Sequence, residues 1–197
     1  PDIEAREDGG TPAFLQTNKA AMAIQLKENM GVDRMMAREK PMVKTLMSGL
    51  RSIPGVHVLA DHIEERLGVI SFHVDDLHYN LGVRLLNDHF GIQTRGGCAC
   101  AGTYGHYLLD ISREKSTSLY NYIESGVMSL KPGWIRMSIH PVMTDEEIQE
   151  LLGAVEAVTR HHKEWEKDYS YRNKTNEFVH HHGQHSERSM VAGWFDL

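Results

Sequence analysis

The stretch from Gly91 to Gly105 constrains the fold most, because it holds five glycines, both cysteines and very little apolar side-chain volume. A run of this composition does not build a hydrophobic core. Glycines at Gly96 and Gly97 allow a sharp turn or a close approach of the backbone to a ligand. We therefore expect a short strand over 91–95 that ends in a thiol-containing loop. The loop is either a tight connection with incidental small residues or a site of chemistry.

The composition is that of an ordinary globular domain. Of the 197 residues, 41% are hydrophobic and 24% charged, which is enough apolar material for a core. The net charge of −6 and the lack of a basic stripe argue against a nucleic-acid partner. No apolar run approaches the ~20 residues that span a bilayer, and no signal peptide is visible, so we expect a cytoplasmic protein without a membrane partner. Two cysteines separated by one residue fit a reducing compartment.

The hydrophobic pattern predicts long helices, then short strands mixed with helices, then a closing helix. The predicted helices cover 13–30, 33–51, 81–90, 107–129 with a break near 112–116, and 144–165, and the predicted strands cover 56–59, 68–74 and 134–140. Thr11 is expected to cap the first helix and Asn80 the third. Pro41 should kink the second helix or start a new one. Thr144 and Glu147 form a capping-box signal. This order is typical of an α+β fold, with a small sheet and helices on one side.

Three parts follow along the chain: an entry segment with the first helix over 1–31, a small domain over 32–167, and a polar tail over 168–197. The tail carries His180, His181, His182 and His185. Three consecutive histidines cannot all face one ion in a regular element, so a solvated tail is the favoured interpretation. A non-catalytic metal-binding module remains the alternative.

The two cysteines are better suited to nucleophilic chemistry than to metal binding. The Cys98-x-Cys100 spacing is tighter than the usual spacing of zinc ligands, and two further ligands at a fitting distance are lacking. We therefore predict no metal site. A nucleophilic cysteine has to be exposed and readily ionised, and a glycine-rich loop near Arg95 and His106 supplies such surroundings.

Arg136 lies in the middle of the predicted strand 134–140. Alternation places Ile135, Met137 and Ile139 on one face, and Trp134, Arg136, Ser138 and His140 on the other. A guanidinium held by a rigid strand suits bidentate binding of a carboxylate. An internal ion pair on a half-solvated sheet face is the alternative.

Three separated segments resemble the C-terminal part of class V aminotransferases, the pyridoxal-phosphate (PLP) enzymes that include cysteine desulfurases and selenocysteine lyases. Gly10-Thr11-Pro12 resembles a glycine-threonine motif whose hydroxyl reaches the PLP phosphate of the neighbouring subunit. The segment 94–100 resembles an arginine-x-glycine-x-x-cysteine motif, which places Cys100 at the sulfur-accepting position. Arg136, followed by Ser138, is similar to the arginine that holds the substrate carboxylate. The resemblance covers roughly residues 7 to 160.

This resemblance implies the small domain of a fold-type I PLP enzyme, with 13–30 as the interdomain helix. It implies Cys100 as the catalytic residue, Gly10 and Thr11 as cofactor-binding residues, and Arg95 and Arg136 as substrate-binding residues. The implied cofactor is PLP in the full-length enzyme. The implied partners are a small amino-acid substrate, a second subunit in a homodimer, and a sulfur acceptor.

Two departures from the family pattern bear on function. The Cys-x-Cys form of the loop is closer to molybdenum cofactor sulfurases than to desulfurases. No serine-x-histidine-lysine segment for the Schiff-base lysine is found, and the chain begins with Pro1. We therefore expect a C-terminal fragment that is folded, binds no PLP and is inactive alone. An aminotransferase in which Cys100 is a bystander remains open.

Overall fold

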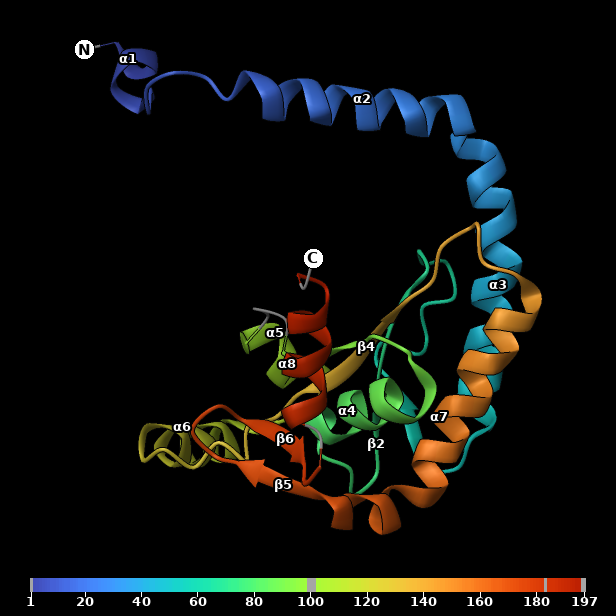
Figure 1. Cartoon of the computed structure of the whole chain (residues 1–197), viewed down its shortest axis with the longest axis vertical. Helices are drawn as coiled ribbons and strands as arrows, with labels where there is room; N and C mark the ends of the chain where they lie inside the picture. Colours follow the sequence, from blue (N-terminus) through green and yellow to red (C-terminus); the bar gives the residue numbers. More distant parts are fainter. Residues whose placement is uncertain (1, 99–101, 183, 196–197) are drawn as a thin grey trace.

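The computed structural model describes residues 2–98, 102–182 and 184–195 and contains a small antiparallel sheet (Figure 1). Its strands are β1 (Val56–Val58), β2 (Val69–Val74), β3 (Arg95–Gly97) and β4 (Trp134–Ser138), in the order β1-β2-β4-β3. Each neighbouring pair is antiparallel. The predicted α+β class is therefore confirmed. The strand expected over 91–95 forms later, at β3.

Three helices cover one face of this sheet and enclose the core: α3 (Val32–Ser52), α4 (Tyr79–Phe90) and α7 (Asp145–Trp165). Side chains of β2 and β4 alternate between the two faces of the sheet as predicted. Those on the core-facing side are buried: Ile70, Phe72, Val74, Ile135 and Met137. Because successive side chains point to opposite faces, the other face of the sheet carries the intervening residues. Helices packed on one side were predicted, and this is confirmed.

Helix α7 begins with the predicted capping box. The Thr144 hydroxyl accepts a hydrogen bond from the Glu147 amide at 3.1 Å, and the Thr144 amide donates to the Glu147 carboxylate at 2.7 Å. Arg38 of α3 donates to the Asp145 carboxylate at 2.7 Å and to the Met143 carbonyl at 2.8 Å. These contacts fix the start of α7 against α3.

Helix α3 runs through Pro41 without interruption, so no new helix starts there. Its buried side chains begin directly after the proline, at Met42. Helix α2 (Phe14–Met30) precedes it and buries none of its residues. Figure 1 shows α2 extending from the end of α3 away from the sheet, with the short helix α1 (Ile3–Glu7) beyond it. No helix among the described residues is long and apolar enough to cross a bilayer.

Helix α4 begins two residues earlier than predicted and ends at Phe90 as predicted. It starts at Tyr79 and its cap is His78, whose Nδ1 accepts a hydrogen bond from the Asn80 amide at 3.1 Å. Asn80 is not the cap, because it lies inside the first turn. At the other end Phe90 is 40% exposed. The following helical region is interrupted as predicted, but at 109–112 rather than near 112–116, between α5 (Gly102–Leu108) and α6 (Arg113–Glu124).

The polar tail contains regular structure that its sequence did not predict. After the short 3₁₀ helix η1 (Glu166–Asp168), strands β5 (Tyr169–Arg172) and β6 (Glu177–His180) form a hairpin, and helix α8 (Gln184–Gly193) follows. The Tyr169 hydroxyl donates to the Asp88 carboxylate at 2.9 Å, which docks the hairpin on α4. Figure 1 shows β5 and β6 beneath α4.

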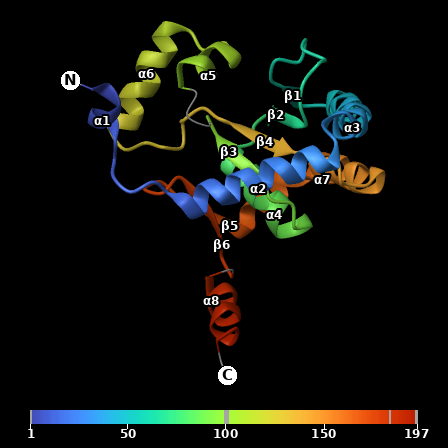
Figure 2. The same cartoon turned by 90° about the horizontal axis from the view of Figure 1, so that it is seen from above.

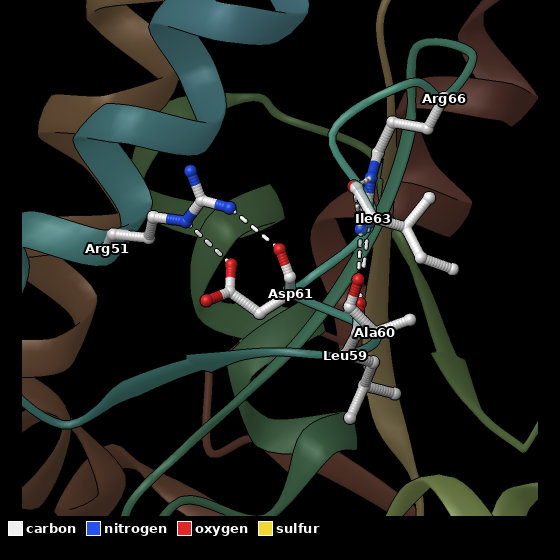
Figure 3. A network of polar contacts seen from close by, with 6 residues as sticks. All are labelled: Arg51, Leu59, Ala60, Asp61, Ile63 and Arg66. Carbon is white, nitrogen blue, oxygen red and sulfur yellow. Dashed lines mark hydrogen bonds and ion pairs between the residues drawn. The ribbon is translucent and has the colours of Figure 1, made fainter.

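The long connection between β1 and β2 is held by two arginines (Figure 3). Arg51 of α3 donates to the Asp61 carboxylate at 2.6 Å and to the Asp61 carbonyl at 2.7 Å. Arg66 donates to the carbonyl of Ile63 at 2.7 Å and also contacts the carbonyls of Leu59 and Ala60. These side-chain hydrogen bonds hold the connection, which has no regular secondary structure, and fix the start of β2.

Candidate active site

The open face of the sheet, opposite the helices, carries a row of polar side chains across three strands. The strand register places Ser71 of β2 opposite Arg136 of β4, and Arg136 opposite Arg95 of β3. Side chains directly opposite each other in an antiparallel pair start about 5 Å apart and lie on one face. The structure therefore brings together the two arginines for which a substrate-binding role was predicted.

This arginine row lacks a counter-charge in the described part of the chain. The Nε of Arg136 is buried and has no hydrogen-bond partner. Neither Arg95 nor Arg136 has an acidic partner among the described residues. Like charges opposite each other destabilise a sheet, and a buried unpaired donor costs about 1–3 kcal/mol. An anion bound between the two guanidinium groups would relieve both costs, which is the chemistry expected of a carboxylate site.

A second row on the same face contains histidines. The rings of His57 and His73 stack with centroids 4.8 Å apart, and His57 Nε2 lies 2.8 Å from the Asp75 carboxylate. The pKa of His73 is lowered, chiefly because burial removes water and further because of His57, while Asp75 opposes the shift. Burial therefore favours the neutral form of His73 on this face.

The end of β3 packs tightly against the segment that leads into β4. Gly97 has a φ of +106°, and a Cβ built on Gly133 would lie 2.9 Å from the Gly97 Cα. Side chains at these positions would force the two backbone segments apart. The thiol of Cys98 donates to the Pro132 carbonyl with a separation of 3.4 Å, so this half-buried cysteine already has a partner.

The predicted nucleophile, Cys100, lies outside the described residues. In the following helix α5, Gly105 packs on the Trp134 ring so closely that a Cβ would lie 3.1 Å from it. His106 is engaged elsewhere, because its Nδ1 lies 3.1 Å from the Ser116 hydroxyl. This contact joins α5 to α6.

Gly10 and Thr11 precede α2, and Figure 1 shows α2 extending away from the sheet that carries the arginine row. The predicted capping role of Thr11 is wrong: α2 begins at Phe14, its cap residue is Ala13, and no side chain bonds to its first amides. Thr11 is exposed, and Gly10 has a φ of +110°. The Phe14 amide donates to the Pro12 carbonyl at 2.9 Å, and no side chain caps the helix start. An exposed hydroxyl before a helix start without a side-chain cap fits a phosphate group.

Two features of the site escaped prediction from the sequence. The pairing of Arg95 with Arg136 depends on register, and alternation alone gives only the face of each residue. The partner of Cys98 is a carbonyl contributed from residue 132, and nothing local signals that contact.

Residues 2–151 match the family model described as "Aminotransferase class-V", and the chain belongs to this family. It is similar to a "Probable cysteine desulfurase" of Staphylococcus epidermidis, 28% identical over 121 residues, which are 61% of this chain and 29% of the relative. A protein of the same name from Staphylococcus aureus is 27% identical over 121 residues, with the same coverage of each chain.

Among solved structures, the chain resembles the "Apo structure of Cysteine Desulfurase from Thermococcus onnurineus NA1". The TM-score is 0.58 at 25% sequence identity, covering 79% of this chain and 33% of that one. The chain thus spans 29% of the length of the curated relatives and 33% of the solved structure.

Proposed function

We propose that this chain is the substrate-binding C-terminal part of a PLP-dependent enzyme that acts on an amino acid and releases sulfur as cysteine desulfurases do. The observation that carries the proposal is the arginine row, in which Arg136 opposes Arg95 without an acidic partner among the described residues. The names of the similar proteins supply the reaction class.

Arg136 binds the α-carboxylate of the substrate in this proposal, and Arg95 adds a second cationic donor across the sheet. A planar guanidinium on a strand offers two parallel N–H donors, which fixes both the position and the orientation of a carboxylate. The substrate thereby replaces the missing partner of the buried Nε. Its side-chain sulfur then points toward the loop that follows β3.

PLP, when bound, supplies the electron sink for bond breaking at the substrate. Gly10 and Thr11 would hold its phosphate, with the Thr11 hydroxyl as the donor, because the Gly10 amide already donates to the Asp8 carboxylate at 3.0 Å. Because α2 carries these residues away from the arginine row of their own chain, they would serve the site of a second subunit in a homodimer. The Schiff-base lysine is assigned to a part of the enzyme outside this chain, since no serine-x-histidine-lysine segment is found here.

Cys100 takes up the sulfur. Its thiolate forms an S–S bond with the substrate sulfur while the carbon–sulfur bond breaks, and the electron pair of that bond stays with the carbon part, which leaves as alanine after protonation. The persulfide on Cys100 is then passed to a sulfur acceptor. Cys98 is the poorer candidate because its thiol is bonded to the Pro132 carbonyl.

The test is sulfur release from L-cysteine by the intact cytoplasmic enzyme, with Cys98→Ser as the matched control for Cys100→Ser. We expect Cys100→Ser to abolish sulfide formation while PLP still binds, because a serine hydroxyl is too weak a nucleophile. Cys98→Ser should keep much of the activity. A persulfide found on Cys98 by mass spectrometry would refute the residue assignment.

Amino transfer is the second candidate, because the arginine row suits the carboxylate of any amino acid. Cys100 is then a bystander. Both cysteine variants would convert an amino acid in the presence of a keto-acid acceptor at the wild-type rate, and neither the wild type nor the variants would release sulfide.

A further inference from the structure

The C-terminal hairpin of β5 and β6 lies outside residues 2–151, which match the family model. Helix α8, which follows the hairpin, extends away from the sheet (Figure 2). The turn of the hairpin, residues 173–176, instead makes side-chain hydrogen bonds to two separate parts of the small domain. The turn is therefore part of the packing of this domain, although the family match does not include it.

Asn176 connects the turn to Tyr79, the first residue of α4. Its side-chain amide donates to the Tyr79 hydroxyl at 2.7 Å, and its side-chain oxygen accepts from the Tyr171 hydroxyl at 2.9 Å. The main-chain carbonyl of Asn176 accepts from the Asn80 side chain. Because both ends of the Asn176 side chain are bonded, the Tyr79 hydroxyl is held at a fixed point.

The buried ring of Tyr79 lies against the backbone at the end of β3. A Cβ built on Gly96 would lie 3.0 Å from this ring, and a Cβ on Gly133 would lie 2.6 Å from it. Glycine at these two positions leaves room for the ring. The ring therefore packs where the end of β3 meets the segment that leads into β4.

Cys98 follows this junction directly. Its thiol donates to the carbonyl of Pro132, the residue before Gly133, with a separation of 3.4 Å. The pKa of the Tyr79 hydroxyl is raised, chiefly by burial and in smaller part by the nearby Cys98 thiol, while the bond from Asn176 opposes the shift. The Cys98 thiol thus lies close to the tyrosine that the hairpin holds.

A second residue of the turn holds the backbone on the other side of this thiol. The Asn173 side chain accepts from the Met128 amide at 2.8 Å and donates to the Gly126 carbonyl. This segment follows α6 and leads through Pro132 into β4. The two asparagines of the turn therefore hold both backbone segments that the Cys98 thiol joins.

We propose that the turn of the C-terminal hairpin positions the Cys98 thiol and the start of the cysteine-containing loop, with Asn176 and Tyr79 as the positioning residues. Cys100 follows Cys98 by two residues, so a fixed start of the loop limits the positions that its thiolate can reach. The consequence for Cys100 rests on the proposed function. The placement of Cys98 does not.

The test measures the rate at which iodoacetamide alkylates Cys98 in the intact enzyme with Cys100→Ser, by mass spectrometry of the peptide that carries it. A thiol that is bonded and partly covered reacts slowly. Tyr79→Phe keeps the ring and removes the hydroxyl, and Cys98 should then react about threefold faster, as expected for one lost hydrogen bond. Asn176→Gly removes two side-chain bonds and tolerates the φ of +55°, and the reaction should be about tenfold faster.

Tyr169→Phe is the matched control, because it removes a hydroxyl bond that holds the same hairpin to α4 at the end away from the turn. It should lower the melting temperature, as Tyr79→Phe does, and leave the alkylation rate of Cys98 unchanged. Equal acceleration in the two tyrosine variants, or no acceleration in Asn176→Gly, would overturn the proposal.

Sulfide release from L-cysteine tests the consequence for Cys100. Asn176→Gly should lose about tenfold in kcat at an unchanged KM, because Asn176 bonds to Tyr79 and not to the arginine row. A wild-type enzyme that releases no sulfide would contradict the proposed function, and the alkylation rates would still decide whether the hairpin positions Cys98. Wild-type kcat in Asn176→Gly, measured beside a wild type that does release sulfide, would overturn the positioning of the loop.

Discussion

Ile135 and Arg136 are neighbours on β4, and the pleat of the strand sends their side chains to opposite faces of one sheet. Ile135 is 1% exposed and packs in the core between β2, α4 and α7. Arg136 lies opposite Ser71 and Arg95, with a buried Nε that has no partner. On the core face, the apolar side chains pack against one another within the chain. On the open face, the positively charged Arg95 and Arg136 lie opposite each other.

The core face stabilises the fold, whereas the open face carries the proposed substrate site. Residues of the core face are stabilised by burial, which contributes about 25 cal/mol per Å² of apolar surface. We expect the arginine row to lower stability, since the buried Nε of Arg136 has no hydrogen-bond partner. Such strain is typical of functional sites, where activity is retained at the expense of stability. The two faces should therefore respond oppositely to substitution.

The largest expected effect is on the core face. Ile135→Ala should lower the free energy of unfolding by about 2–5 kcal/mol, because it removes buried methyl groups and leaves a cavity. Arg136→Met keeps the aliphatic length and removes the charge, and we expect it to leave stability unchanged or to raise it by up to about 1 kcal/mol. Urea unfolding of both variants measures this. A loss of stability in Arg136→Met similar to that in Ile135→Ala would show that the guanidinium supports the fold.

A smaller loss of stability is expected at Gly96 of the edge strand β3, which packs against α4. A Cβ on Gly96 would lie 2.7 Å from the Asn80 side-chain oxygen, 3.0 Å from Tyr79 and 3.1 Å from Val83. Gly96→Ala should therefore cost about 1–3 kcal/mol through overpacking against α4. Gly102→Ala is the control, since a Cβ there meets nothing within 4 Å. Equal melting temperatures of the two variants would mean that α4 does not hold β3 closely.

The smallest effect concerns the pH dependence of stability on the open face. The folded-state pKa of His73 is lowered from its ordinary value of 6.5. Below that value the unfolded chain takes up the proton more readily than the folded chain, so stability is full above pH 6.5 and is lost as pH falls through the folded pKa. His73→Gln should reduce the loss of stability between about pH 7.5 and 5. The exposed His62→Gln serves as the control, and an identical slope in both would contradict the burial of His73.

Much of the fold followed from local pattern. Alternation in 68–74 and 134–140 predicted which side chains face the core, because a strand has a period of two residues. The Thr144–Glu147 capping box predicted the start of α7, because both bonding groups lie within one turn. The helix over 13–30 was also predicted, although nothing in its sequence revealed that it would bury no residue.

The remaining features depend on contacts between distant residues. The pairing of Arg95 with Arg136 is a register, which local periodicity does not determine. The hairpin is held by Asn176, whose side chain bonds to the distant Tyr79. Asn176 also adopts a φ of +55°, a conformation that asparagine tolerates better than most residues. The tail has no hydrophobic period because much of its attachment is polar.

The most direct test of the open face as a carboxylate site is the turnover of L-cysteine by the intact enzyme with Arg136→Lys. An ammonium group cannot reproduce the planar two-donor geometry, and losing a charge-assisted pair costs about 1.5–3 kcal/mol, or roughly ten- to a hundredfold in kcat/KM. Arg51→Lys is the matched control, because Arg51 pairs with Asp61 away from the open face. We predict a tenfold or greater loss for Arg136→Lys and little change for Arg51→Lys. Unchanged kcat/KM in Arg136→Lys would contradict the assignment of this face to the substrate.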